Sequence, residues 1–278
     1  QLLGRMLEER RYAEATAFYF EAVRQDPGNM PVLRPTVDDY VRQCLRHCDS
    51  ASFVELVDRA GILIVFAGTK SGDDTGAVSA FIVEKDTPGW SMERKVKKMG
   101  TNAVSASELV FEDCRVPEQN RLGQEGDGQV MAAKVLGYNC VVTAARALGI
   151  AQGAFDYALN YTQEREQFGR PIAFFQGIQF MLADMATLVE AGRYLLYRGC
   201  AEIDRGEEGG FHTASMAKCF LSDSAMKVST DAVQLLGGYG FMKDHPVERM
   251  MRDAKLTQIS VGTNRMRHLV LAQEMLAL

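Results

Sequence analysis

The chain has 278 residues, of which 47% are hydrophobic, and a formal net charge of −5. A chain of this length and composition can bury a sizeable core, and we expect two or three domains. The acidic balance argues against nucleic acid as a partner, because nucleic-acid-binding surfaces carry an excess of lysine and arginine. The N-terminal sequence is charged too early for a secretory signal, and no apolar run is long enough to cross a membrane.

Six cysteines are scattered through helical and strand patterns. This usage is typical of free, buried thiols in a reducing compartment, and it favours the cytoplasm or the mitochondrial matrix over secretion. Cys44 and Cys48 lie one helical turn apart beside His47, but no second cluster accompanies them. Packing is therefore the simpler interpretation, and we expect no metal site.

Residues 1–59 are expected to form a separate helical segment. Tyr12, Ala15, Tyr19 and Ala22 fall where a tetratricopeptide repeat (TPR) interlocks large and small side chains. One such unit is visible, whereas a solenoid needs about three. A TPR-like segment and an amphipathic helical hairpin therefore both explain the pattern.

Residues 60–121 have the periodicity of strands. Short apolar or alternating runs separated by turn residues predict strands over 62–68, 77–85, 90–98 and 103–112. We expect a small antiparallel β-domain here.

Residues 122–278 are predicted to form an antiparallel helical bundle. Helical patterns cover 129–163, 176–203, 213–236 and the residues after 263, with a short helix over 246–254. Small residues between 144 and 154 would allow helices to approach closely. We interpret the methionines, among them Met181, Met185, Met216 and Met226, as core filler.

The sequence EREQFGRPIAFFQ joins the first two long helices and suits a dinucleotide. Arg165 can donate paired hydrogen bonds to a phosphate, Phe168 offers a flat face, and Gln176 offers an amide at the start of a helix. The alternative is an arginine and a phenylalanine that only close a helical hairpin.

A second motif runs from Gln234 to Thr263. Gly237, Gly238 and Gly240 provide positions without Cβ, where a helix can end or the backbone can lie close to another surface. Thr263 is expected to cap the last helix, and the positive end of that helix would suit an anion.

The order LLGGYGF, PVERMMRDAK and GTNRMRHLVLAQE resembles the C-terminal signature of the acyl-CoA dehydrogenase family of flavoproteins. Lys98-Met99-Gly100 and Val116-Pro117 resemble the later part of that family's β-domain. The resemblance covers roughly residues 60–278. It implies an α+β fold in which a small antiparallel β-domain is followed by an antiparallel four-helix bundle.

The resemblance also implies FAD as the cofactor. By motif, the residues facing FAD are Arg165, Gln167, Phe168, Gln176, Gln234, Gly237, Gly238 and Thr263. The family usually has glutamine where this chain has Arg265. The implied reaction is α,β-oxidation of an acyl-CoA thioester, in which a base removes the α-proton while hydride passes from the β-carbon to the flavin.

The two positions where the family places its catalytic glutamate hold Val261 and Asn139. Gly137 and Cys140 stand where an aspartate and an arginine help to hold the acyl-CoA. Three interpretations remain open: a dehydrogenase with another base or a partner's base, a non-catalytic homologue acting as a binding or assembly subunit, and a helical scaffold without cofactor. The resemblance implies acyl-CoA and an electron-transferring flavoprotein as partners. It also implies a homo-oligomer, a dimer or tetramer, with a hetero-oligomer as the alternative.

Overall fold

The computed structural model describes residues 62–69, 77–104, 106–207 and 209–276. The TPR-like segment, with Cys44, His47 and Cys48, lies outside these residues. The described chain divides into two compact units. The first comprises residues 62–98, 102–136 and 272–276, and the second comprises residues 99–101 and 137–271.

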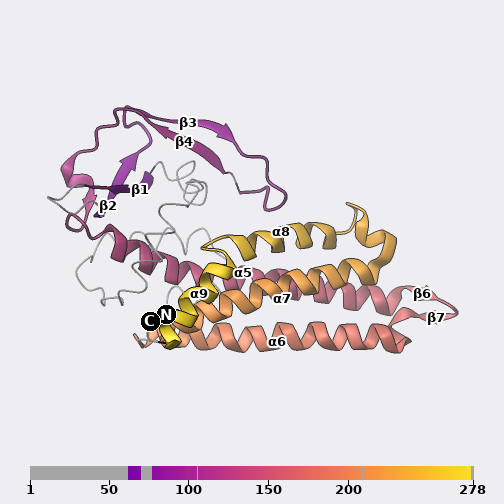
Figure 1. Ribbon diagram of the computed structural model, residues 1–278. Coiled ribbons are helices and arrows are strands. Elements are labelled where there is room, and N and C mark those ends of the chain that lie inside the picture. The colour runs from indigo at the N-terminus through magenta and orange to yellow at the C-terminus, as the bar shows by residue number, and fades with distance from the viewer. Residues whose placement is uncertain (1–61, 70–76, 105, 208, 277–278) are drawn as a thin grey trace. The chain divides into compact units, whose positions relative to one another are not determined.

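The strands of the first unit form two small antiparallel sheets (Figure 1). In one sheet β1 (Ile62–Gly68) pairs with β2 (Val78–Glu84), which pairs in turn with β5 (Arg121–Leu122). In the other, β3 (Trp90–Lys95) pairs with β4 (Ser107–Phe111). The short helix η3 (Glu118–Asn120) leads into β5. The predicted small antiparallel β region is therefore confirmed.

A hydrophobic cluster lies between the strands of this unit. Leu63 and Val83 are cross-strand partners and both are buried. Partly buried side chains complete the cluster, namely Val65, Trp90, Leu109 and Val116. The Trp90 indole stacks on Phe111 with 6.3 Å between ring centroids and donates a hydrogen bond to the Glu84 carbonyl.

β3 and β4 are shorter than the predicted ranges 90–98 and 103–112. The register between them shifts between Met92 and Lys95, and β3 ends at Lys95. Beyond that point the Lys98 ammonium donates to the Val104 carbonyl. This hydrogen bond closes a loop where the sequence predicts that the two strands continue to pair.

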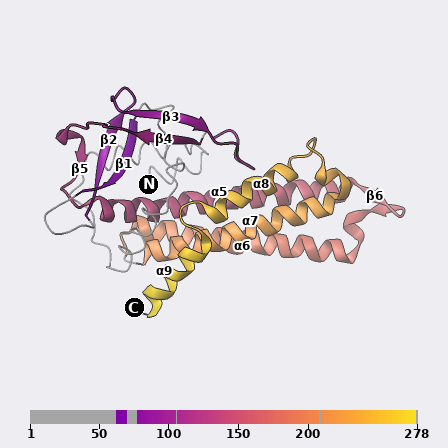
Figure 2. The ribbon, with the colours of Figure 1, turned by 45° about the horizontal axis from the view of Figure 1, so that its top comes forward.

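Five helices follow, as predicted. They are α5 (Gly128–Glu164), α6 (Gln176–Asp204), α7 (Gly210–Leu236), α8 (Val247–Ile259) and α9 (Asn264–Leu276). In the second unit, the later part of α5 runs side by side with α6, α7 and α8 (Figures 1 and 2). The hairpin β6 (Glu166–Gln167) and β7 (Arg170–Pro171) and the short helix η4 (Ile172–Phe174) connect α5 to α6. The short helix η5 (Gly237–Phe241) follows α7.

Small side chains form the buried face of α5. Ala144, Ala147, Ala151, Ala154 and Ala158 are completely buried and recur at helical spacing. Small side chains at these positions let neighbouring helices approach closely, although larger side chains of the same helix, among them Val141 and Leu148, are also buried. The seam predicted from the alanine and glycine cluster is thus present.

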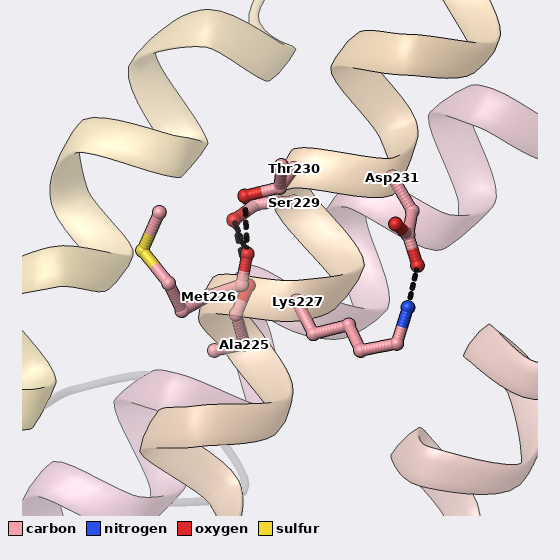
Figure 3. A network of polar contacts seen from close by, with 6 residues as sticks. All are labelled: Ala225, Met226, Lys227, Ser229, Thr230 and Asp231. Carbon is pink, nitrogen blue, oxygen red and sulfur yellow. Dashed lines mark hydrogen bonds and ion pairs between the residues drawn. The ribbon is translucent and has the colours of Figure 1, made fainter.

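Helix α7 carries polar side chains and still packs in the interior. The buried Ser229 hydroxyl donates to the Ala225 carbonyl one turn earlier, and Thr230 donates to the Met226 carbonyl (Figure 3). Lys227 and Asp231 form an ion pair of 2.7 Å along the same helix. Because the buried Ser229 hydroxyl finds its acceptor within α7, burial leaves it hydrogen-bonded, and the exposed Thr230 hydroxyl makes the same kind of bond at the surface.

Helix α8 is longer than the predicted range 246–254 and continues to Ile259. Thr257 is completely buried and its hydroxyl donates to the Ala254 carbonyl. A threonine satisfied in this way can stay helical, although its β-branched side chain lowers its intrinsic helix propensity. Packing therefore extends the helix beyond the sequence pattern.

The residues that the structure describes lack two kinds of feature. None of their helices is both long and apolar enough to cross a membrane. Their histidine, cysteine, aspartate and glutamate side chains form no group suited to a metal ion. Cys140 and Cys219 are buried free thiols, and Cys114 and Cys200 are free and partly buried.

Two glycines test how tightly the helices pack. A Cβ added at Gly192 would overlap the buried Leu221 side chain, whereas one added at Gly149 would meet nothing within 4 Å. We expect Gly192→Ala to lower the free energy of unfolding by about 1 to 3 kcal/mol through overpacking. Gly149→Ala should raise it by about 0.5 to 1 kcal/mol through helix propensity. Urea denaturation measures both, and equal effects would contradict the described packing.

Candidate functional site

An open pocket of about 510 Å³ lies in the second unit, where α5 ends and α7 gives way to η5. This volume is within the range of small-molecule sites. The lining residues are Tyr161, Arg165, Gln167, Ile172, Gln234, Leu235, Leu236, Gly237, Gly238, Tyr239 and Met242. They include five of the predicted cofactor residues, namely Arg165, Gln167, Gln234, Gly237 and Gly238.

Glycine is required at two positions of η5, of which Gly237 lines the pocket and Gly240 does not. Gly237 has φ +58°, a conformation that other residues rarely adopt. Gly240 is buried, and an added Cβ would overlap the main chain of Val233. Gly238 differs, because a Cβ there would meet nothing within 4 Å. The pocket wall is therefore bare main chain at Gly237 and Gly238.

Arg165 is fixed through its main chain and by an aromatic ring. Its N–H donates to the Tyr161 carbonyl, and its own carbonyl accepts from the Ile172 N–H, both at 2.8 Å. The guanidinium carbon lies 5.5 Å from the centroid of the Tyr239 ring. Stacking on an aromatic ring uses the face of the guanidinium, so its in-plane N–H donors stay available for an anion.

A cluster of aromatic rings around His245 supports Tyr239. The His245 ring packs against Tyr239 with 5.5 Å between centroids, and also against Tyr157 and Tyr161. The Tyr157 hydroxyl and His245 Nδ1 are hydrogen-bonded at 2.8 Å. Sequence reasoning missed this cluster. One signal was available, since Tyr157 and Tyr161 are four residues apart and so share a face of α5.

Three predicted residues lie outside the pocket lining. Phe168 is 93% exposed at the tip of the β6–β7 hairpin, and its φ of +52° together with +79° at Gly169 is typical of a type I′ turn. Gln176 begins α6, and Thr263 precedes α9. The contact of these three residues with a cofactor stays a prediction.

Thr263 ends a turn, Ser260–Thr263, that is held by buried cations. The Val261 carbonyl accepts from Arg267 Nε at 3.0 Å and Nη2 at 2.9 Å. The Gly262 carbonyl accepts from Lys218 Nζ at 2.9 Å. The Thr263 hydroxyl accepts from the Met266 N–H at 3.4 Å, which confirms the predicted helix cap.

Lys218 is completely buried in α7, and Arg267 is 4% exposed. The pKa of Lys218 is lowered from 10.5 to about 8, mainly by burial; the nearby Arg267 charge acts in the same direction, whereas Cys219, Cys140 and Asp223 act in the opposite direction. The ammonium also donates to Asn264 Oδ1 at 2.8 Å. No local pattern indicates the role of this lysine, because its acceptors lie more than forty residues along the chain.

The Arg252-Asp253 motif has a structural role in this chain. Arg252 pairs with Glu248 and donates to the Met99 carbonyl, and Asp253 accepts from the Thr101 N–H. The pKa of the Glu248 carboxyl is lowered, mainly by its hydrogen bond from Arg252. The motif therefore fastens residues 99–101 to α8.

The chain is similar in sequence to a known family of proteins. The model of the acyl-CoA dehydrogenase C-terminal domain matches residues 126–276. An acyl-CoA dehydrogenase of Bacillus subtilis is 48% identical over 227 residues, which is 82% of this chain and 60% of that protein. The chain therefore belongs to the acyl-CoA dehydrogenase family, and it spans about three fifths of the length of this relative.

Solved structures share the fold. Butyryl-CoA dehydrogenase from Megasphaera elsdenii is 43% identical with a TM-score of 0.75, over 78% of this chain and 56% of that chain. A chain in a structure described as the electron transferring flavoprotein of Acidaminococcus fermentans is 47% identical with a TM-score of 0.76. That match covers 80% of this chain and 58% of the other. The fold predicted from the sequence is thus confirmed.

The pKa of Lys218 makes stability depend on pH. Below about pH 8 the folded protein carries the full desolvation penalty of a buried ammonium. Between about pH 8 and 10.5 the folded state loses this proton before the unfolded chain does, so the free energy of unfolding rises with pH. Relative to Lys218→Gln, we expect the free energy of unfolding of the wild type to rise by about 1 to 3 kcal/mol between pH 7 and 10.

Urea denaturation at each pH measures that difference. Lys227→Gln is the matched control, because Lys227 lies on the same helix but is exposed. The difference in free energy of unfolding between Lys227→Gln and the wild type should change little between pH 7 and 10. If the free energy of unfolding of the wild type relative to Lys218→Gln stayed constant or fell as the pH rose, the lowered pKa of Lys218 would be contradicted.

Proposed function

We propose that this chain is a flavoprotein that binds FAD in the pocket at the end of α5 and α7, and that its reaction is the FAD-dependent α,β-oxidation of an acyl-CoA thioester. The observation that carries the proposal is that two motifs far apart in the sequence meet there. Arg165 and Gln167 come from one motif, and Gln234, Gly237 and Gly238 from the other. Family membership and the likeness to butyryl-CoA dehydrogenase support the reaction class.

The residues of the pocket fit the pyrophosphate of a dinucleotide. The Arg165 guanidinium can donate two parallel hydrogen bonds to phosphate oxygens. Gln234 adds an amide that can both donate and accept. The bare main chain at Gly237 and Gly238 lets the backbone approach the cofactor closely. The exposure of Phe168 fits a contact with FAD bound by a second copy of the chain.

FAD, when bound, would supply the acceptor for the hydride that leaves the β-carbon. The chain itself would orient the thioester and exclude water. Removal of the α-proton needs a base within hydrogen-bond reach of the α-carbon, with a pKa brought near the working pH. In the wild-type chain that base would be a residue other than those at positions 139 and 261, or a residue that a partner supplies.

The residues that occupy the family's two base positions favour a second function. The Val261 side chain has no proton acceptor, and the Asn139 amide does not take a proton at neutral pH. A non-catalytic homologue that serves as a binding or assembly subunit accounts for both residues. In that case the TPR-like segment would be its interaction module.

The partners follow from the proposed reaction. We propose acyl-CoA as the substrate and an electron-transferring flavoprotein as the electron acceptor. The likeness to a chain in an electron transferring flavoprotein structure supports the second of these. We expect a homo-oligomer, with a hetero-oligomer under the alternative function, in the cytoplasm or the mitochondrial matrix.

The pocket assignment is tested by FAD titration of purified variants. We expect Arg165→Met to raise the Kd for FAD by about 10- to 100-fold, because a hydrogen bond to a charged group contributes about 1.5 to 3 kcal/mol. Arg170→Met is the matched control, since Arg170 stacks on Phe175 and is absent from the pocket lining. Equal affinities of the two variants would contradict the assignment.

The reaction is tested by mixing FAD-loaded protein with a panel of acyl-CoAs without oxygen. Val261→Glu supplies a carboxylate at a position where the family has its base. If the wild type has no base, this variant should reduce its flavin at least about 100-fold faster than the wild type, because a general base contributes about 10² to 10⁴ in rate. If the wild type has another base, the two rates should be similar. Stopped-flow absorbance of the flavin measures both rates.

The outcomes separate the two functions. Rapid reduction in the wild type would support an active dehydrogenase with another base. Reduction in Val261→Glu alone would support the non-catalytic homologue. If neither protein reduces its bound FAD, position 261 is not where a base can act, and the proposed reaction fails.

A further inference from the structure

The turn Ser260–Thr263 is fixed at its carbonyl groups by side chains from two helices. Lys218 reaches the Gly262 carbonyl from α7, and Arg267 reaches the Val261 carbonyl from α9. Both cations are buried, which makes their hydrogen bonds costly to break. The contacts are all made to main-chain oxygens of the turn and so do not depend on the side chain at position 261.

Asn264 ties the same two helices together beside the turn. Its Oδ1 accepts from Lys218, and its Nδ2 donates to Ser222 Oγ and to Asp223 Oδ1, both at 2.9 Å. The amide is thus hydrogen-bonded at both its oxygen and its nitrogen. The Lys218 ammonium has a fixed acceptor on each side, in Gly262 and in Asn264.

Val261 is in a conformation that its own side chain disfavours. Its φ is +60°, in the left-handed region, where a β-branched residue is a genuine outlier. Such strain persists when the surroundings determine the backbone more strongly than the residue does. The two buried donors at the carbonyls of Val261 and Gly262 are surroundings of this kind.

We propose that Lys218 and Arg267 are positioning residues that hold the Ser260–Thr263 turn by its carbonyls, so that the turn is preformed whatever side chain stands at position 261. A carboxylate introduced there would then be presented in the same place as the present valine side chain. The role of this turn in oxidation rests on the proposed function. The proposal that Lys218 and Arg267 hold the turn does not depend on that function.

A thermal double-mutant cycle tests the holding of the turn without flavin chemistry. Val261→Asn should raise the Tm of the full chain by about 2 to 4 °C, because asparagine adopts the left-handed region far more readily than valine. In Lys218→Met the turn loses a tether, so the gain from Val261→Asn should fall to less than half. In Lys227→Met the full gain should remain, because the Lys227 ammonium pairs with Asp231 along α7 (Figure 3) instead of with a carbonyl of the turn.

An equal gain from Val261→Asn in all three backgrounds would overturn the proposal. If Lys218→Met does not fold, Arg267→Lys replaces it in the cycle. That variant keeps the charge but loses the two-nitrogen contact with the Val261 carbonyl, and the same reduction of the gain is expected. A gain from Val261→Asn that survives in Arg267→Lys at full size would likewise overturn the proposal.

The rate of flavin reduction gives the functional measure. In Val261→Glu, adding Lys218→Met should lower the rate at least 10-fold, whereas adding Lys227→Met should leave it within 2-fold and the Kd for FAD within 3-fold. An unchanged rate with Lys218→Met would show that Lys218 does not position residue 261. If Val261→Glu itself is inactive, the proposed oxidation fails, and the thermal cycle still decides whether the turn is held.

Discussion

The candidate site depends on the reversal of the chain between Leu236 and Phe241. Helix α7 ends at Gly237 because a positive φ breaks the helix there, and Gly240 lets the returning chain pack against the main chain of Val233. Gln234, in the last turn of α7, and the bare main chain at Gly237 and Gly238, where the reversal begins, line one pocket with Arg165 at the end of α5. The reversal also places Tyr239 so that one ring contacts both the Arg165 guanidinium and His245.

Two parts of the second unit have different implications for function. The pocket contains an arginine whose guanidinium can donate to an anion, an amide and exposed main chain, a set that suits a dinucleotide. The turn at Val261 is held by buried donors yet presents a hydrocarbon side chain. A protein can thus have the means to bind a cofactor and lack a side chain that takes a proton. This difference is the physical basis of the two functions that we propose for the chain.

The helices, the strands and part of the site could be predicted from local pattern. Apolar periodicity placed α5 within one residue at each end, and the motifs selected five residues that line one pocket. Other features depend on contacts distant in sequence. The extension of α8 to Ile259 follows from the burial of Thr257, and the support of Tyr239 by His245 requires the fold to bring α5 and the 245 region together. The acceptors of Lys218 and the left-handed Val261 have the same origin, so no local pattern could reveal them.

The most direct measurement is an experimental structure of the purified chain with FAD. We expect density for the pyrophosphate beside Arg165, with the main chain of Gly237 and Gly238 against the cofactor. We also expect the Ser260–Thr263 turn to keep the carbonyl contacts of Lys218 and Arg267. FAD bound elsewhere, with Arg165 free of phosphate, would contradict the assignment of the pocket. A chain that takes up no FAD at saturating concentration would contradict the proposal that it is a flavoprotein.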